Sequence, residues 1–227
     1  AREFAAAAQN AGADGLLLLP PYLVDTTPSG VLAHVRYVAA ATELPITVYQ
    51  RANAVLDTAA AVALLDIANV TGIKDGRGDV DAMLRLVTAI RTSGHPRADE
   101  FGFLNGLPTA ELSAHAYRAI GVDTYSSASL CFVPDIASAF YRAYTTNDEA
   151  LTRLLLAEFY LPFAALRGQV PGYAVSLVKA GARMAGLPMG TVRPPLVEPS
   201  AEHLERLSEI IDAGRKALAS YRTESAR

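Results

Sequence analysis

Short apolar segments without regular polar alternation recur along the first part of the chain, at intervals of roughly 20 to 30 residues. Such segments are typical of strands buried on both faces of a parallel sheet. Between them, apolar residues recur at the three-to-four-residue spacing of an amphipathic helix. The pattern predicts five strands, over residues 15–20, 45–50, 70–74, 101–105 and 122–126.

The segments between and after these strands predict helices. Asp57 is expected to be an N-cap, and Pro108 suits the first turn of a helix. After Phe132 the pattern contains helices only. The predicted helices cover residues 29–41, 57–69, 79–91, 108–120, 133–144, 149–166, 174–186 and 201–220.

The alternation of strand and helix predicts an α/β fold with a parallel sheet. Five parallel strands fit an open, doubly wound sheet as well as a barrel. The doubly wound fold that binds dinucleotides carries a glycine-rich phosphate loop after a strand. The segment Gly76-Arg77-Gly78 is too short for that loop and is interpreted as a strand-to-helix turn. The missing fingerprint favours the barrel.

Composition narrows the class of protein. With 51% hydrophobic and 19% charged residues, the chain is expected to be compact and globular, and its net charge of −3 gives no basic footprint for nucleic acid. No apolar run reaches the roughly 18 residues of a membrane span. The start of the chain has no signal-peptide pattern.

The single cysteine, Cys131, excludes an intrachain disulfide, fits a cytoplasmic location and is expected to be buried. The four histidines lack metal-binding spacing, so no metal is predicted.

Candidate chemistry gathers at the predicted carboxyl ends of the strands, where active sites of parallel α/β folds lie. Lys74 stands out because the chain has only three lysines and this one ends an apolar strand. Its position leaves two interpretations open: a nucleophile towards ketones, or the partner of Asp75 in an ion pair. Tyr49 is either a proton relay or a packed rim residue, and Arg51 is either a carboxylate-binding or a surface residue.

Several motifs together resemble the dihydrodipicolinate synthase/N-acetylneuraminate lyase family, and within it the branch of decarboxylating sugar-acid dehydratases. The resemblance runs from Arg2 to about Leu218. The general mark is the Tyr49 strand followed by GIKD at 72–75. The more specific marks are LLLPPY (17–22), VYQRANAV (48–55), KDGRGD (74–79), NGLPTAE (105–111), TYSSA (124–128), GYAVSLVKAGAR (172–183) and VRPPL (192–196).

The resemblance implies a class I aldolase-type lyase that removes water and CO₂ from 5-dehydro-4-deoxy-D-glucarate, giving 2,5-dioxopentanoate in sugar-acid breakdown. It implies Lys74 as the Schiff-base lysine and Tyr49 as a proton-transfer residue, without a cofactor. The expected partner is a small 2-keto-3-deoxy diacid, in a homodimer or homotetramer without nucleic acid or membrane. The substrate-binding candidates are Arg51, Asn53, Asn105, Gly106, Ser126 and Ser127. The alternatives are another pyruvate-type aldolase or synthase of the family, and a non-catalytic barrel fragment.

The departures from the family also carry information. The second tyrosine and the carboxylate-binding arginine of the synthases fall on Leu23 and Ala54, which argues against a synthase. The dehydratases are expected to have Asn where this chain has Gln50. Nothing matches the family's Gly-Thr/Ser-Glu loop after the second strand, so the resemblance implies a (β/α)8 barrel that is N-terminally incomplete here. Residues 1–145 are predicted to form its fourth to eighth βα units, and residues 146–227 a C-terminal helical region.

Overall fold

A computed structural model of the chain describes residues 1–21, 23–51 and 53–225. Contacts divide the chain into two compact units. Unit 1 comprises Ala1–Leu107 and Ala116–Ser126, and unit 2 comprises Pro108–His115 and Ser127–Arg227. This division differs from the expected boundary after residue 145, because helix α6 (Pro134–Thr146) packs against the helices that follow it. The division into two domains stays a prediction.

Unit 1 contains the parallel sheet that the apolar segments predict. Its strands follow one another in chain order and every neighbouring pair is parallel. The strands are β1 (Leu16–Leu18), β2 (Ile46–Gln50), β3 (Val70–Asp75), β4 (Gly102–Asn105) and β5 (Thr124–Tyr125). All five predicted strands are therefore confirmed, each within its predicted segment or one residue beyond it.

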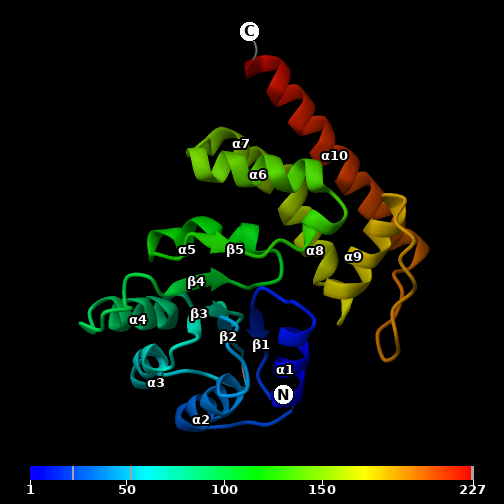
Figure 1. Cartoon of the computed structure of the whole chain (residues 1–227). Coiled ribbons are helices and arrows are strands. Elements are labelled where there is room, and N and C mark those ends of the chain that lie inside the picture. Colours follow the sequence, from blue (N-terminus) through cyan, green and yellow to red (C-terminus); the bar gives the residue numbers. More distant parts are fainter. Residues whose placement is uncertain (22, 52, 226–227) are drawn as a thin grey trace. The chain divides into compact units, whose positions relative to one another are not determined.

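Helices connect these strands and follow one another around the outside of β1 to β4 (Figure 1). Polar side chains start three of them: Thr27, Asp57 and Asp79 each accept a hydrogen bond from a backbone N–H of the first turn. The N-cap role of Asp57 is thus confirmed, at 2.7 Å from the Ala60 nitrogen. The helices are α1 (Arg2–Asn10), α2 (Pro28–Ala39), α3 (Thr58–Ala63) with the 3-10 turn η1 (Leu64–Asp66), α4 (Val80–Arg91) and α5 (Ala114–Ala119).

The two faces of the sheet differ in burial, and this difference orients the strand ends. Ile46, Val48 and Ile73 are buried in the apolar core with side chains of α2, α3 and α4. Tyr49 and Lys74 alternate with them and are only half-buried. Because successive side chains of a strand point to opposite faces, Tyr49 and Lys74 lie on the face away from this core.

Unit 2 is helical, and its core is aromatic. Phe159 and Phe163 stack with ring centroids 5.7 Å apart, and Phe132 packs beside both. A Cβ at Gly214 would lie 2.9 Å from the Phe159 Cβ, so this glycine lets the last helix approach closely. Besides α6, the unit contains the 3-10 turns η2 (Ala110–Leu112) and η3 (Ser129–Cys131), the helices α7 (Glu149–Leu155), α8 (Leu161–Arg167), α9 (Tyr173–Met184) and α10 (Ala201–Ser225), and the π-helical turn η4 (Leu156–Tyr160).

Three expectations are corrected by this structure. The helix predicted over residues 108–120 does not start at Pro108, because Thr109 has a left-handed φ of 55°, and it is divided into η2 and α5 at Ser113, whose φ is −110°. The helix predicted over 149–166 is interrupted by the π-helical turn η4, which ends two residues before Pro162. Cys131 is exposed and not buried.

Candidate active site at the carboxyl ends of the strands

Lys74 and Tyr49 lie side by side at the carboxyl ends of β3 and β2. Parallel pairing sets Tyr49 opposite Lys74, and Gln50 opposite Asp75. The Lys74 Nζ lies 4.8 Å from the centroid of the Tyr49 ring. The Tyr49 hydroxyl donates a hydrogen bond of 3.3 Å to the backbone oxygen of Gly106, at the end of the next strand. Three neighbouring strand ends thus contribute to one amine–phenol pair.

The electrostatic setting of Lys74 favours its neutral amine. Burial lowers the pKa of Lys74 from its ordinary value, and the positive charge of Arg51 lowers it further. Among residues 1–21, 23–51 and 53–225, no carboxylate lies within ion-pair distance of Lys74. The expected alternative, an ion pair with Asp75, is therefore not found. A lysine with a lowered pKa and no counter-ion is a better nucleophile than an ordinary surface lysine.

Two glycines leave the space that these side chains occupy. A Cβ at Gly106 would lie 2.4 Å from the Lys74 Cε and 2.8 Å from the backbone oxygen of Asp75. A Cβ at Gly76 would lie 2.6 Å from the Tyr49 ring. The carbonyl of Asp75 belongs to a paired strand and cannot shift cheaply. Gly106 was expected to bind substrate, and the structure gives it the further task of making room for Lys74.

Gly106→Ala is therefore expected to slow reaction at Lys74. The added methyl group displaces the lysine stem, and a misplacement of about 1 Å can cost a factor on the order of 10² in rate. The measurement is the rate of irreversible borohydride trapping of pyruvate on the protein, for which we expect a loss of roughly tenfold or more. Gly102→Ala, at the start of β4, is the matched control, because its Cβ would meet the Thr71 oxygen at an ordinary contact distance of 3.5 Å. Equal trapping rates in the two variants would contradict this assignment.

Arg51 and Asn53 line a cleft of about 450 Å³ beside the ends of β1 and β2. Arg51 is exposed, and its guanidinium lies 5.6 Å from the centroid of the Tyr49 ring. The Asn53 amide donates hydrogen bonds to the backbone oxygens of Pro21, at 2.8 Å, and Val24, at 3.3 Å. Asn53 thus shapes the loop after β1. The tyrosine of the LLLPPY motif, Tyr22, lies outside the described residues.

The remaining expected site residues follow β4 and β5. Asn105 is fully buried, and its side-chain oxygen accepts a hydrogen bond of 3.2 Å from the Leu107 nitrogen. The Ser126 nitrogen donates to the Asn105 backbone oxygen, at 3.0 Å. Ser127 begins a segment of unit 2, and its hydroxyl donates to the carboxylate of Glu111. In unit 1 the structure therefore brings Lys74, Tyr49 and Gly106 together, whereas Asn105 pairs with Asp75 and its buried side chain lies on the other face of the sheet.

Glu111 anchors a buried polar cluster that sequence reasoning missed. Its side chain is 1% exposed, and its Oε1 also accepts a hydrogen bond of 3.0 Å from Ser129. Burial raises the pKa of Glu111, although the hydroxyls of Ser127, Ser129 and Tyr160 act in the opposite direction. Arg167 belongs to the same cluster. Burial lowers its pKa, although the charge of Glu111 acts in the opposite direction. The available signal was Glu111 at the end of the NGLPTAE motif, a charged residue within an apolar helical pattern.

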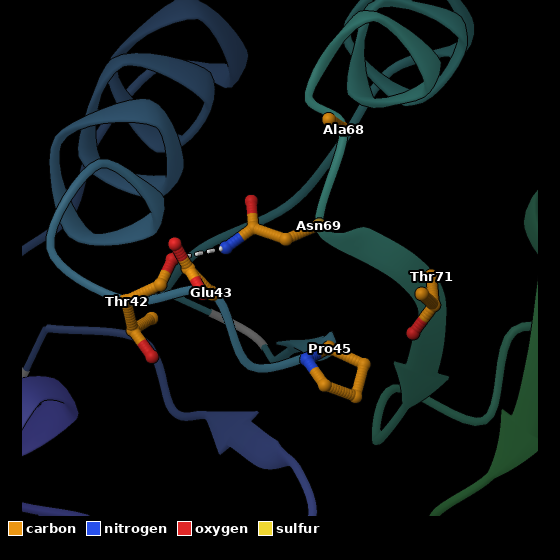
Figure 2. A pocket seen from close by; sticks show the side chains of 6 residues that line it. All are labelled: Thr42, Glu43, Pro45, Ala68, Asn69 and Thr71. Carbon is orange, nitrogen blue, oxygen red and sulfur yellow. Dashed lines mark hydrogen bonds between the residues drawn. The ribbon is translucent and has the colours of Figure 1, made fainter. Parts of the chain in front are cut away.

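A second hollow lies at the opposite ends of the strands and offers no comparable chemistry. It has a volume of about 570 Å³ and is lined by Thr42, Glu43, Pro45, Ala68, Asn69 and Thr71. Figure 2 shows the Asn69 amide turned towards Thr42, to whose backbone oxygen it donates at 2.8 Å. Polar groups here hold connecting loops together, as is typical of the amino-terminal face of such sheets.

Over residues 1–21, 23–51 and 53–225, no three histidine, cysteine or acidic side chains are grouped so that they could bind a metal ion. Within the same residues, no helix is both long and apolar enough to cross a membrane.

A parallel sheet with a reactive lysine at the carboxyl end of a strand is the arrangement of Schiff-base enzymes built on (β/α) barrels. Residues 1–214 match the Dihydrodipicolinate synthetase family, and the chain belongs to that family. This membership supports a lyase of the class I aldolase type.

Individual members of the family are similar to this chain over most of its length. A probable 5-dehydro-4-deoxyglucarate dehydratase of Streptomyces griseus is 54% identical over 219 residues, which is 96% of this chain and 68% of the relative. A second protein of that name, from Streptomyces avermitilis, is 52% identical over 211 residues, which is 93% of this chain and 66% of the relative. The chain thus spans about two thirds of the length of these relatives.

Solved structures confirm the predicted fold class. Dihydrodipicolinate synthase from Oceanobacillus iheyensis matches with a TM-score of 0.82 and 22% identity, over 95% of this chain and 69% of that one. The synthase from Bacillus clausii gives a TM-score of 0.81 and 24% identity, over 94% and 70%. At this identity the likeness shows the fold alone, a barrel-type α/β arrangement followed by helices.

Proposed function

We propose that the protein dehydrates and decarboxylates 5-dehydro-4-deoxy-D-glucarate, releasing 2,5-dioxopentanoate, CO₂ and water. One observation carries the proposal: the Lys74 amine, which has a lowered pKa and no ion-pair partner among the described residues, lies over the Tyr49 phenol at a strand end. The likeness to proteins named as probable 5-dehydro-4-deoxyglucarate dehydratases supplies the substrate. No cofactor is required, because a covalent iminium ion supplies the electron sink.

The first step is Schiff-base formation. The neutral amine of Lys74 adds to the ketone carbon of the substrate, and loss of water from the adduct gives an iminium ion. Only the unprotonated amine can add, so the lowered pKa of Lys74 increases the reactive fraction at neutral pH. The positive charge of Arg51 contributes to this effect from the neighbouring strand end.

Water and CO₂ then leave through the same electron sink. Tyr49 assists removal of a proton from the CH₂ beside the iminium carbon, and the resulting enamine expels the hydroxyl of the next carbon as water. The new double bond is conjugated with the iminium ion. Cleavage of the bond to the far carboxylate releases CO₂ and sends its electron pair through that double bond to nitrogen. Protonation on carbon and hydrolysis of the Schiff base give the product and free Lys74.

The far carboxylate needs a fixed orientation for this last cleavage. Arg51 is a suitable group, because it is exposed, lines the cleft and forms no ion pair with any described residue. The position that carries the carboxylate-binding arginine in synthases is Ala54 here, and Ala54 is 1% exposed. Asn53, which lines the same cleft, and Ser126 and Ser127 at the later strand ends remain proposed substrate contacts, whereas the buried side chain of Asn105 lies on the Asp75 face of the sheet.

Product analysis tests the reaction, and Arg51→Ala tests the carboxylate contact. The protein given 5-dehydro-4-deoxyglucarate should release one CO₂ per substrate consumed and no pyruvate.

We expect Arg51→Ala to lower CO₂ release by about tenfold to 100-fold, in line with the loss of a charge-assisted contact that acts on the reacting bond. The rate of pyruvate trapping should fall far less, because pyruvate lacks a second carboxylate. The pH midpoint of trapping should move to higher pH, because the Arg51 charge that lowers the pKa of Lys74 is gone. Pyruvate as a product would instead identify an aldolase.

We further propose a homo-oligomer, a dimer or tetramer, in the cytoplasm. Large apolar side chains support the oligomer: Phe4 and Leu23 are each 82% exposed. Such side chains are often covered by a second copy of the chain. Sedimentation of the protein at several concentrations tests this proposal.

A further inference from the structure

Asp75 follows Lys74 directly, yet its carboxylate belongs to a different set of contacts. It is 1% exposed. One oxygen accepts hydrogen bonds from the Gln50 side chain, at 2.9 Å, and from the Arg77 nitrogen, at 3.2 Å. The other oxygen accepts from the Tyr117 hydroxyl and, at 3.3 Å, from the Gly78 nitrogen. Four donors from three parts of unit 1 thus converge on this one carboxylate.

Two of these parts, the end of β2 and the turn after β3, adjoin the amine–phenol pair, and the third is helix α5. Gln50 follows Tyr49 in β2, and its side-chain oxygen accepts a hydrogen bond of 3.4 Å from the Leu56 nitrogen, which orients its amide towards Asp75. Tyr117 lies in α5 and is fully buried. Burial and the neighbouring Asp75 charge raise the pKa of Tyr117, so its hydroxyl keeps the proton that it donates.

The two backbone donors, the N–H groups of Arg77 and Gly78, hold the turn that contacts the Tyr49 ring. Arg77 and Gly78 belong to the turn after β3, and the same turn contains Gly76, whose Cα faces the Tyr49 ring. The Gly76 nitrogen also donates to the Gln50 backbone oxygen, at 3.0 Å. The backbone oxygen of Asp75 accepts a hydrogen bond of 2.7 Å from Gly106, the glycine that leaves room for Lys74. Asp75 is therefore connected to both glycines on which the placement of Lys74 and Tyr49 depends.

We propose that Asp75 is a positioning residue that holds the Lys74 amine against the Tyr49 phenol, with Tyr117 and Gln50 as its supports. This inference rests on the proposed Schiff-base chemistry of Lys74. Strand alternation directs Lys74 and Asp75 to opposite faces of the sheet, and no ion pair joins them. Asp75 therefore acts on geometry and not on the charge state of the amine. A geometric role predicts a slower reaction at an unchanged pKa of Lys74.

The test compares Asp75→Asn, Tyr117→Phe and the double variant with the unaltered protein. The rate of borohydride trapping with pyruvate is measured from pH 6 to pH 10, and turnover of 5-dehydro-4-deoxyglucarate is measured at several concentrations. In Asp75→Asn one carboxylate oxygen becomes an NH₂ group that faces existing donors, so the turn should shift. We expect a fall in kcat and in trapping rate of roughly tenfold to 100-fold, with KM changed less than about threefold and the pH midpoint of trapping unmoved.

Coupling between the variants adds a second criterion. Because Tyr117 acts through Asp75, Tyr117→Phe should slow trapping in the same direction, and the double variant should be no slower than the slower single variant. Tyr173→Phe is the matched control: it removes a hydroxyl, 2.9 Å from His203, from another buried tyrosine that lies in unit 2. Its trapping rate should equal that of the unaltered protein. Should Asp75→Asn not fold, Tyr117→Phe alone decides the question.

The outcomes separate this inference from the function on which it rests. If the unaltered protein is trapped and both variants are trapped at its rate, the positioning role is wrong although the proposed function stands. A shift of the pH midpoint in Asp75→Asn would show an electrostatic role and would also overturn the inference. If the unaltered protein itself is not trapped, the proposed function fails and the inference fails with it.

Discussion

Lys74→Met is expected to abolish turnover of 5-dehydro-4-deoxyglucarate and covalent trapping of pyruvate. The thioether cannot form an iminium ion, so the electron sink for both eliminations is lost. Removing a nucleophile of this kind typically costs a factor on the order of 10⁴ or more. Turnover is measured as CO₂ release, and trapping as a gain of mass in the intact protein. Lys179→Met is the matched control, because the Lys179 amine donates to the Thr191 backbone oxygen and lies on α9. Residual turnover in Lys74→Met would contradict the Schiff-base mechanism.

The same variant should also change the pH dependence of stability. A pKa of Lys74 that is lower in the folded than in the unfolded state means that the unfolded chain binds the proton more readily. Protonation of Lys74 therefore disfavours the fold at neutral pH, and this penalty disappears as pH rises past the ordinary lysine value of about 10.4. Melting curves should show Lys74→Met as stable as the unaltered protein or more stable near pH 7, with the difference shrinking towards pH 11.

Tyr49→Phe is expected to have the second-largest effect. Loss of the phenol removes the proposed proton-transfer group but leaves the ring that packs beside the amine, so the Schiff base should still form. Turnover should fall by roughly 10² to 10⁴, the usual contribution of general acid–base catalysis. Pyruvate trapping should change by less than about threefold. Tyr37→Phe, on the exposed face of α2, is the control. A parallel loss of trapping and turnover in Tyr49→Phe would show that the hydroxyl acts on the position of Lys74 and not on proton transfer.

The sequence predicted the sheet and its strand ends because these depend on local patterns. The run Val70–Ile73 is short and mostly apolar, and Lys74 and a glycine-containing turn follow it, so the strand and the lysine at its end could be recognised without tertiary information. The same alternation would have placed Asp75 on the face opposite Lys74. The hypothesis of an ion pair between them considered only their adjacency in the chain.

The errors lie where distant residues decide the backbone. A helix from Pro108 onwards follows from a favourable first turn, but Thr109 adopts a left-handed conformation, and its hydroxyl accepts a hydrogen bond from Arg167 in α8. A contact between residues 58 positions apart leaves no local signal. Glu111 was overlooked for a similar reason, since its hydroxyl partners Ser127 and Ser129 lie just before and in the later turn η3. The roles of the candidate site residues stay predictions.

The most direct measurement of the central claim is the site of covalent labelling. The protein is mixed with 5-dehydro-4-deoxyglucarate or pyruvate, reduced with borohydride, digested, and mapped by mass spectrometry. The chain has three lysines, Lys74, Lys179 and Lys216, so the result is unambiguous. The account predicts a single stable adduct on the peptide that contains Lys74. An adduct on Lys179 or Lys216, or turnover of the substrate with no adduct on any lysine, would contradict it.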